Sequence, residues 1–193
     1  MGVAKVNAAG RTLDAHALRG QVGLAMGTDE LFDGTIEENI TVGRALSFEQ
    51  VWEAVRLAAL DAPLLALPDG LQTQVVGTGR ALPTGIARRI MIARALAGRP
   101  RLLVLDDAYE GLEPAVRDRV VASIYGAPWW TVVDTSDEPA VLAQADEVHV
   151  LTREGGFEPA GSPVEAAAPG STLDRLQPEI AAALRQSLVA DAS

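Results

Sequence analysis

A short, wholly apolar run that ends in two carboxylates constrains the fold of this chain more than any other feature. Residues 102–107 read LLVLDD. Consecutive apolar residues without alternation predict a strand that is buried on both faces, as in a parallel sheet. Ligand sites of parallel α/β sheets lie outside the carboxyl ends of the strands. The sequence therefore predicts a site at Asp106 and Asp107.

Helical patterns alternate with short apolar runs around this strand, and that order predicts an α/β domain. The predicted helices are 13–19, 36–40, 48–60, 86–97, 114–125 and 172–190. The other predicted strands are 21–26, 131–133 and 148–151. Thr35 is a candidate helix cap, and Ser47 followed three residues later by Gln50 forms a capping-box pattern.

Charge and composition narrow the classes of function. The chain has 16 Lys and Arg against 26 Asp and Glu, a formal net charge of −10, which disfavours binding to nucleic acid or to an anionic membrane surface. It has no cysteine, so disulfides and thiolate metal sites are excluded. No apolar stretch reaches the ~18 residues of a membrane span, and the first residues lack the pattern of a signal peptide. We therefore predict a soluble, cytoplasmic protein with no direct membrane insertion.

Three segments, in order, carry a resemblance to a known family. They read LFDGTIEENI at 31–40, LPDGLQTQVVG at 67–77, and ARAL through RPRLLVLDD to GLEP over 93–114. The region from about Ala4 to Pro163 resembles the nucleotide-binding domain of ATP-binding cassette (ABC) transporters of the exporter type. The resemblance implies an α/β, P-loop NTPase-like fold with a RecA-like parallel sheet plus a helical subdomain. We place the family-like region at 1–170 and a C-terminal amphipathic helix at 171–193.

The first departure from the family is its phosphate-binding loop. The family cradles the ATP phosphates in a glycine-rich loop that ends in Gly-Lys-Ser/Thr. Lys5 is the only lysine of the sequence and stands between Ala4 and Val6, so no residue here fits the motif. By resemblance, the chain begins just downstream of the loop and is N-terminally truncated. Two interpretations of the missing loop stay open. The chain is a half-site that a partner completes, or the loop is missing only because the sequence boundary falls at this point.

Four residues fall at the catalytic and sensor positions that the resemblance implies. Asp106 matches the carboxylate that orders Mg²⁺, and Asp107 stands where the family has a glutamate that polarises the attacking water. Asp107 is shorter by one methylene, so catalysis should slow, because reach within hydrogen-bonding distance governs proton transfer. Gly27 replaces the glutamine that precedes the Leu-Phe pair, and Ser136 replaces the switch histidine.

The family's signature motif, Leu-Ser-Gly-Gly-Gln, stands here as Leu82, Pro83, Thr84, Gly85 and Ile86. In the family this segment begins a helix and, across a dimer, holds the γ-phosphate of the partner's ATP. Pro83 has neither a hydroxyl nor an N–H, and Thr84 places a branched side chain where backbone must approach phosphate. We therefore do not expect ATP and Mg²⁺ to bind tightly to this chain alone.

These departures leave three hypotheses about function. The chain is a degenerate, non-hydrolysing partner or regulatory subunit of a transporter-like assembly, or an ATP-hydrolysing transporter subunit whose phosphate loop lies upstream or in another chain, or a scaffold that keeps only the fold. The resemblance also implies that the sheet lacks a central strand and one covering helix, which would leave apolar area exposed. Either the remaining strands close up, or a partner covers the gap.

The expected partners follow from these hypotheses. We predict oligomerisation with another ABC-type domain or with a second copy, and no nucleic-acid partner. By resemblance, a transmembrane transporter subunit would seat on residues 32–40 and hold the protein at the inner face of the membrane.

Overall fold

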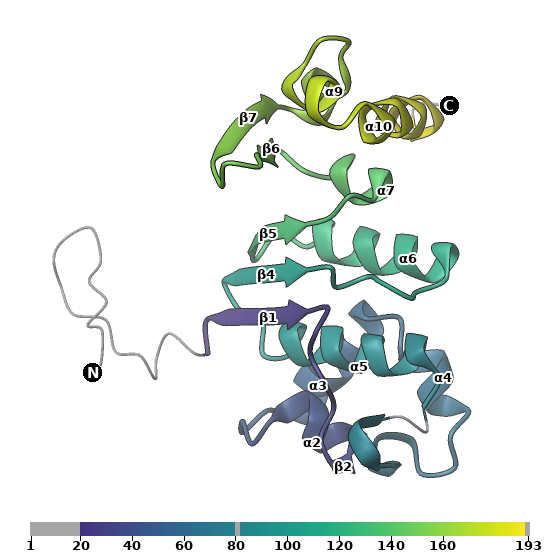
Figure 1. Cartoon of the computed structure of the whole chain (residues 1–193). Helices are drawn as coiled ribbons and strands as arrows, with labels where there is room; N and C mark the ends of the chain where they lie inside the picture. The colour runs from purple at the N-terminus through teal and green to yellow at the C-terminus, as the bar shows by residue number, and fades with distance from the viewer. Residues whose placement is uncertain (1–19, 80–81, 192–193) are drawn as a thin grey trace, which may run out of the picture. The chain divides into compact units, whose positions relative to one another are not determined.

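The computed structural model describes residues 20–79 and 82–191 (Figure 1). These residues form two compact units, and the division falls between Thr135 and Ser136. The limits predicted from the sequence, 1–170 and 171–193, differ from this division and stay a prediction. The predicted helix over 13–19 and the lone Lys5 lie outside the described residues.

The first unit is built on a parallel sheet of three strands in the order β1-β4-β5 (Figure 1). The strands are β1 (Val22–Met26), β4 (Leu102–Asp106) and β5 (Thr131–Thr135). Ala25 lies opposite Leu105, and Leu105 lies opposite Asp134. The buried strand predicted from LLVLDD is thus the middle strand of a parallel sheet.

The other elements of this unit are mostly helices. They are α2 (Ile36–Thr41), α3 (Phe48–Leu57), α4 (Asp61–Leu65), α5 (Thr84–Leu96) and α6 (Pro114–Tyr125). A small antiparallel pair joins β2 (Gly34–Thr35) to β3 (Gln74–Val75), and two 3-10 turns cover Gly70–Gln72 and Gly77–Gly79. Helix α5 packs against β1, α2 and α3, so it links the sheet to the smaller helices. This arrangement agrees with the predicted parallel sheet plus helical subdomain.

Both predicted helix caps are present. The Thr35 hydroxyl accepts the Glu38 N–H at 3.0 Å, and the Thr35 N–H donates to the Glu38 carboxylate at 2.7 Å. Ser47 makes the same reciprocal pair with Gln50 at the start of α3. Helix α3 ends at Leu57 rather than at the predicted residue 60, because Ala59 adopts a left-handed conformation with φ of 52°.

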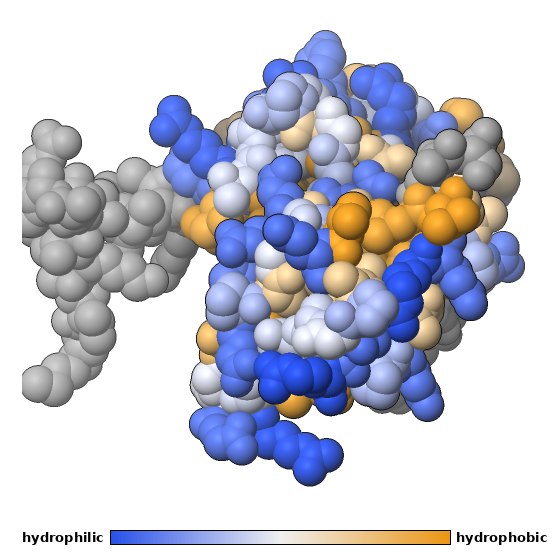
Figure 2. All heavy atoms as spheres, turned by 90° about the horizontal axis from the view of Figure 1, so that it is seen from above, coloured by the Kyte–Doolittle hydropathy of each residue, from blue (hydrophilic) through white to orange (hydrophobic). Residues whose placement is uncertain are grey.

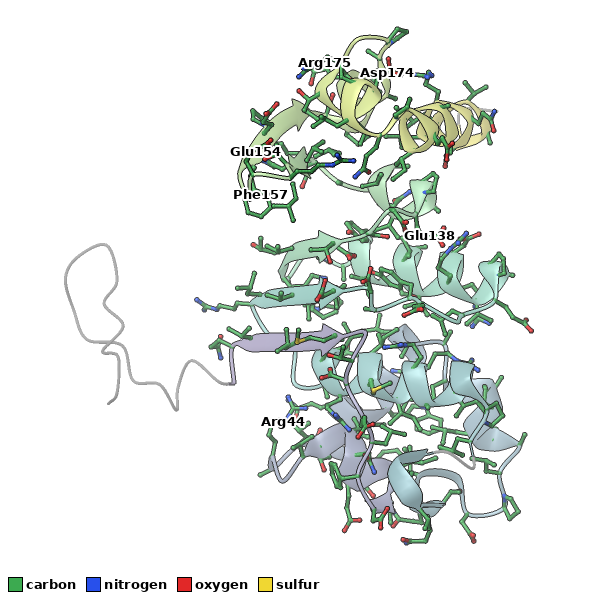
Figure 3. All side chains as sticks on the ribbon, in the orientation of Figure 1. Arg44, Glu138, Glu154, Phe157, Asp174 and Arg175 are labelled. Carbon is green, nitrogen blue, oxygen red and sulfur yellow. The ribbon has the colours of Figure 1, made fainter. Side chains whose placement is uncertain are left out.

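Arg44 fastens the ends of two helices together, and its side chain is labelled in Figure 3. Its guanidinium donates to the carbonyls of Ile40 and Thr41 at the end of α2, each at 2.9 Å. It also donates to the carbonyls of Arg94 and Ala97 at the end of α5, again at 2.9 Å. The last carbonyls of a helix have no partner within the helix, so one side chain satisfies groups from both.

The two faces of the sheet differ sharply in exposure. On one face Ala25, Leu103 and Leu105 are buried beneath the helices. A Cβ on Gly23 would lie 2.1 Å from the Ala95 carbonyl oxygen, so α5 rests directly on the backbone of β1. On the opposite face Val22, Leu24 and Val133 are 40%, 48% and 52% exposed. This difference agrees with the expectation that apolar area of the sheet is left exposed.

The second unit has its own core. It contains α7 (Pro139–Leu142), β6 (Val148–Leu151), β7 (Phe157–Gly161), α8 (Pro163–Ala167), α9 (Thr172–Leu176) and α10 (Pro178–Asp191). Strands β6 and β7 form an antiparallel hairpin through a turn at Gly155, whose φ is 81°. Val148, Val150, Leu173 and Leu184 are buried together in its centre.

The single C-terminal helix predicted over 172–190 is wrong in one respect. The chain forms two helices, α9 and α10, that are separated at Gln177. Proline disfavours the helical conformation of the residue before it, and Gln177 before Pro178 has φ of −142° and ψ of 68°. The Asp174 carboxylate in α9 accepts a hydrogen bond from the Arg185 guanidinium in α10 at 3.2 Å, so a side-chain contact links the two helices.

The surface is mixed in character. Figure 2 shows hydrophilic and hydrophobic residues interspersed over the face in view. Among the described helices, none is long and apolar enough to cross a membrane.

Candidate functional site

The carboxyl edge of the parallel sheet brings three of the predicted site residues together. Asp106 ends β4, and its half-buried carboxylate accepts a hydrogen bond from the Thr135 hydroxyl at the end of β5. The Gly27 N–H, just beyond β1, donates to the Asp106 carbonyl at 2.6 Å. A Cβ on Gly27 would lie 3.2 Å from the Cβ of Asp107. Gly27, Asp106 and Asp107 therefore form one cluster, as their positions after parallel strands predict.

Asp107 is held in a strained backbone conformation at this edge. Its φ is 48°, a left-handed value that is uncommon for residues other than glycine. Its N–H donates to the Thr135 carbonyl and its carbonyl accepts from the Glu110 N–H, each at 3.3 Å. Asp107 is exposed at this edge.

The signature segment lies at the N-terminus of α5, which is two residues longer at this end than predicted. Pro83 is the N-cap and makes no side-chain cap, and Thr84 is the first helical residue. The Ile86 N–H donates to the Pro83 carbonyl at 2.8 Å, so this amide is already paired. A Cβ on Gly85 would meet the Gly111 carbonyl at 3.8 Å, which places the segment beside the turn that follows β4.

Two arginines of α5, which sequence reasoning missed, hold the site together. Buried Arg88 donates to the carbonyls of Met26 at 3.2 Å and Gly27 at 3.0 Å, and to the Glu110 carbonyl at 3.3 Å. Arg89 donates to the carbonyls of Gly85 at 2.9 Å and Ala59 at 2.7 Å. Both guanidiniums therefore use their Nε and Nη1 donors on backbone carbonyls, and the Arg88 Nη2 lies 4.0 Å from the Glu110 carboxylate. No local pattern could have found them, since their partners lie up to about sixty residues away in the chain.

A partly buried carboxylate also lies next to the cluster, on the covered face of the sheet. The Asp134 Oδ2 accepts from the Tyr109 hydroxyl at 2.8 Å and from the Tyr125 hydroxyl at 3.1 Å. Burial raises the pKa of Asp134 to about 6, against the lowering effect of the two hydroxyls, and the neighbouring charges of Asp107 and Asp106 raise it further. Burial likewise raises the pKa of both tyrosines, so they stay protonated donors. The one sequence signal was an acid directly after the predicted strand 131–133.

Ser136, at the switch-histidine position, begins the second unit. Its hydroxyl accepts the Glu138 N–H at 3.1 Å, which is a local turn contact. The only histidine among the described residues, His149, lies 3.2 Å from Glu147 on the surface. The His149 and Glu147 side chains are 46% and 61% exposed, so their contact is a surface ion-pair contact.

The described residues fit only part of a nucleotide and Mg²⁺ site. Asp106 is a suitable oxygen ligand at a strand end, but residues 20–79 and 82–191 hold no cluster of three or more His, Asp or Glu side chains for a metal. The Asp106 and Asp107 carboxylates place negative charge at this edge, which disfavours a triphosphate. The first unit is therefore a domain of the parallel α/β class. Acidic side chains lie at the carboxyl ends of its strands, beside the N-terminus of α5.

Comparison with known proteins identifies the family of this domain. The ABC transporter ATP-binding protein YwjA of Bacillus subtilis, named as uncharacterised, is 32% identical over 147 residues, which are 75% of this chain and 26% of YwjA. A fatty acid ABC transporter ATP-binding/permease protein of Mycobacterium bovis is 38% identical over 103 residues, 53% of this chain and 16% of that protein. A multidrug efflux ATP-binding/permease protein of Mycobacterium tuberculosis is 36% identical over 143 residues, 73% of this chain and 12% of that protein.

The solved structure of a bacterial Atm1-family ABC exporter with ATP bound has the same fold. It matches with a TM-score of 0.76 at 28% identity, over 93% of this chain and 31% of that chain. No family model matches the chain. The chain is a homologue of the ATP-binding domain of exporter-type ABC transporters, and it spans about a quarter or less of the length of these curated relatives.

Proposed function

We propose that the chain is a degenerate ABC-type ATP-binding domain that does not hydrolyse ATP and acts as a partner or regulatory subunit of a transporter-like assembly. The observation that carries this proposal is the charge of the carboxyl edge. Asp106 and Asp107 lie there next to Asp134, and Arg88 and Arg89 use their Nε and Nη1 donors on backbone carbonyls, so these donors are not available to phosphate oxygens. A triphosphate needs cations around it for binding and for stabilising the transition state.

The N-terminus of α5 supports the same proposal. In the family this helix start holds a γ-phosphate across a dimer, through a hydroxyl and free backbone donors. Pro83 supplies neither, and the Ile86 N–H is already bonded within the turn. The helix dipole remains and attracts an anion by only about 0.3–1 kcal/mol at an exposed site, too little to bind ATP.

An ATPase assay with Mg²⁺ on the 193-residue chain tests the proposal, with the ATP-binding domain of the Atm1-family exporter as a positive control. We expect no turnover above the blank and no saturable binding of a fluorescent ATP analogue at micromolar concentration. The Pro83→Ser variant should be equally inactive, since it restores the hydroxyl and the N–H but supplies no cation. Turnover at the rate of the control domain would contradict the proposal.

One observation favours a second candidate, an ATP-hydrolysing subunit whose phosphate loop is supplied upstream or by another chain. Asp106 keeps its place at the strand end, and its carboxylate is oriented by Thr135. That geometry is what a carboxylate ligand of Mg²⁺ requires, with its own hydrogen-bond partner behind it. A Gly-Lys-Ser/Thr motif in the genomic sequence ahead of Met1 would favour this candidate over the first.

For the membrane partner, we propose docking at residues 32–40. Phe32 is 40% exposed, but its backbone is held in place by buried Asn39. The Asn39 side chain accepts the Phe32 N–H at 3.0 Å and donates to the Phe32 carbonyl at 2.9 Å. The Arg94 guanidinium lies 5.7 Å from the Phe32 ring centroid and supports it from one side. A rigid, exposed aromatic residue is a suitable anchor for a partner helix. The substrates named for the relatives are not assigned to this chain. A substrate would have to be identified with such a complex.

A further inference from the structure

Arg99 attaches α3 to the end of the sheet where β4 and β5 begin. It lies in the turn between α5 and β4, and its guanidinium donates to the Glu53 carboxylate of α3 through Nε at 2.9 Å and through Nη2 at 2.6 Å. The same guanidinium lies 4.8 Å from the ring centroid of Trp129, just ahead of β5. One side chain therefore contacts both α3 and the amino end of the sheet.

The Trp129 side of this contact is fixed. Its ring packs edge-on against Trp130, with ring centroids 5.5 Å apart, and the Trp130 Nε1 donates to the Ile124 carbonyl in the last turn of α6 at 2.8 Å. A guanidinium over an aromatic face is attracted by the charge distribution of the whole ring, without one required hydrogen-bond direction. Trp129 is thus a platform over which the Arg99 guanidinium can move.

The backbone of Arg99 is strained. Its φ is 52°, a left-handed value that is uncommon for residues other than glycine. The next residue is Pro100, and proline favours extended conformations in the residue before it. Strained backbone of this kind persists only where surrounding contacts hold it, and it is frequent in segments that switch. The contacts of the side chain with Glu53 and Trp129 can supply that hold.

A hollow of about 300 Å³ lies beside the ion pair and is lined by Glu49, Gln50, Glu53, Arg56 and Arg99. The pair is open to solvent, since the side chains of Arg99 and Glu53 are 57% and 22% exposed. An ion pair that is partly in water is held weakly. The guanidinium therefore has the room and the freedom to leave Glu53.

Glu49 offers Arg99 a second carboxylate, one helical turn from Glu53 on the same face of α3. Its own N–H and then the Ser47 hydroxyl lower the pKa of the Glu49 carboxyl, so it is ionised at neutral pH. Glu53 would keep a cation as well, because Arg56 lies three residues further along α3. The hydrogen bond from Arg99 is the main cause that lowers the pKa of Glu53, and the charge of Arg56 lowers it further. The pairs Arg99–Glu49 and Arg56–Glu53 thus form a second arrangement in which each charge is compensated.

We propose that Arg99 is a two-position latch, whose guanidinium pairs with Glu53 or with Glu49 while α3 changes its tilt against the amino end of the sheet. The structure shows the latch in the Glu53 position. Because an ion pair is present in either position, α3 stays attached to the sheet as it moves.

The test measures the exchange of the Arg99 Nε proton with water, by NMR of the whole chain with ¹⁵N-labelled arginine, and Arg99→Lys identifies the signal. We expect Glu53→Ala to change the exchange rate by less than about threefold, because Arg99 then pairs with Glu49 one turn away. Glu49→Ala alone should leave the rate in the same range, since the observed pair is intact. The double variant Glu49→Ala/Glu53→Ala should exchange at least about tenfold faster, because the charge-assisted hydrogen bond has no carboxylate acceptor left on this face.

A matched control separates the latch from a general effect of the substitution. Glu179→Ala removes an exposed glutamate in the first turn of α10 and should leave the Arg99 signal unchanged. Alanine favours the helix, so α3 persists in all the variants.

Two results would overturn the proposal. If Glu53→Ala alone accelerates exchange as much as the double variant does, Glu49 is not a second position. If the double variant exchanges as slowly as the natural chain, the carboxylates of α3 do not hold Arg99. Neither ATP nor a partner takes part in this measurement, so its failure is independent of the ATPase result that tests the proposed function.

Discussion

Replacing Asp134 by asparagine should stabilise this protein at neutral pH, although it removes a charge that two tyrosines contact. The pKa of Asp134 is raised from 3.8 to about 6, chiefly by burial. A carboxyl with a raised pKa binds its proton more tightly in the folded than in the unfolded state. Its effect on stability is therefore most favourable below pH 4 and is lost as pH rises through 6.

The magnitude follows from the size of that shift. Each pKa unit corresponds to about 1.4 kcal/mol, so a shift of about 2 units gives roughly 3 kcal/mol, which we reduce to about 2 kcal/mol because the side chain is only partly buried. The asparagine amide oxygen can still accept from Tyr109 and Tyr125. Asp134→Asn should be about 2 kcal/mol more stable than the natural chain at pH 7.5 and about equal at pH 4.

Urea unfolding followed by tryptophan fluorescence at several pH values measures this difference. Comparing the two chains at each pH cancels the contribution of other carboxylates, such as Glu53, whose pKa is lowered by its hydrogen bond to Arg99. Asp69→Asn, at an exposed loop position, is the control and should follow the natural chain at every pH. A stability difference for Asp134→Asn that does not change between pH 4 and 7.5 would refute the reasoning.

Three further substitutions probe the fold of the first unit. Leu105→Ala, at a fully buried position of β4, should lower the free energy of unfolding by about 3 kcal/mol. Leu65→Ala, at an exposed position, should change it by less than about 0.5 kcal/mol. Similar urea midpoints for both variants would contradict the assigned core. Asn39→Ala should cost about 2 kcal/mol, because buried Asn39 bonds the backbone of Phe32 and Thr35, and faster hydrogen exchange at the Phe32 amide should accompany the loss. Ser47→Ala should cost about 1 kcal/mol by removing the cap of α3, and an unchanged thermal midpoint would show that Gln50 alone suffices.

Local chemistry was enough to predict much of this fold. The run LLVLDD predicted the central parallel strand, because an unbroken apolar run is typical of strands in parallel sheets, although only one face of this sheet is buried. Ser47 with Gln50 predicted the start of α3, and Pro114 the start of α6, since caps and first-turn prolines act within a few residues. The C-terminal helix was predicted as continuous because its apolar spacing continues through Pro178, where the backbone cannot follow.

The candidate site was predictable only in part. Gly27, Asp106 and Asp107 could be placed together because they follow strands that share one edge. Their surroundings could not, because Arg88 contacts backbone carbonyls from two distant turns and Asp134 depends on hydroxyls from two other elements. Long-range contacts of this kind leave no periodic trace in a sequence. Oligomerisation and the membrane partner stay predictions.

The four carbonyls that Arg44 gathers have a mechanical consequence. A guanidinium is a flat, rigid fork, and a lysine ammonium with three donors on a flexible stem could not reach all four oxygens. Sliding α2 along α5 would break several charge-assisted bonds at once, so the two helices respond to force as a single lever. If a partner docks at Phe32 as proposed, we expect any displacement of α2 to move α5 with it.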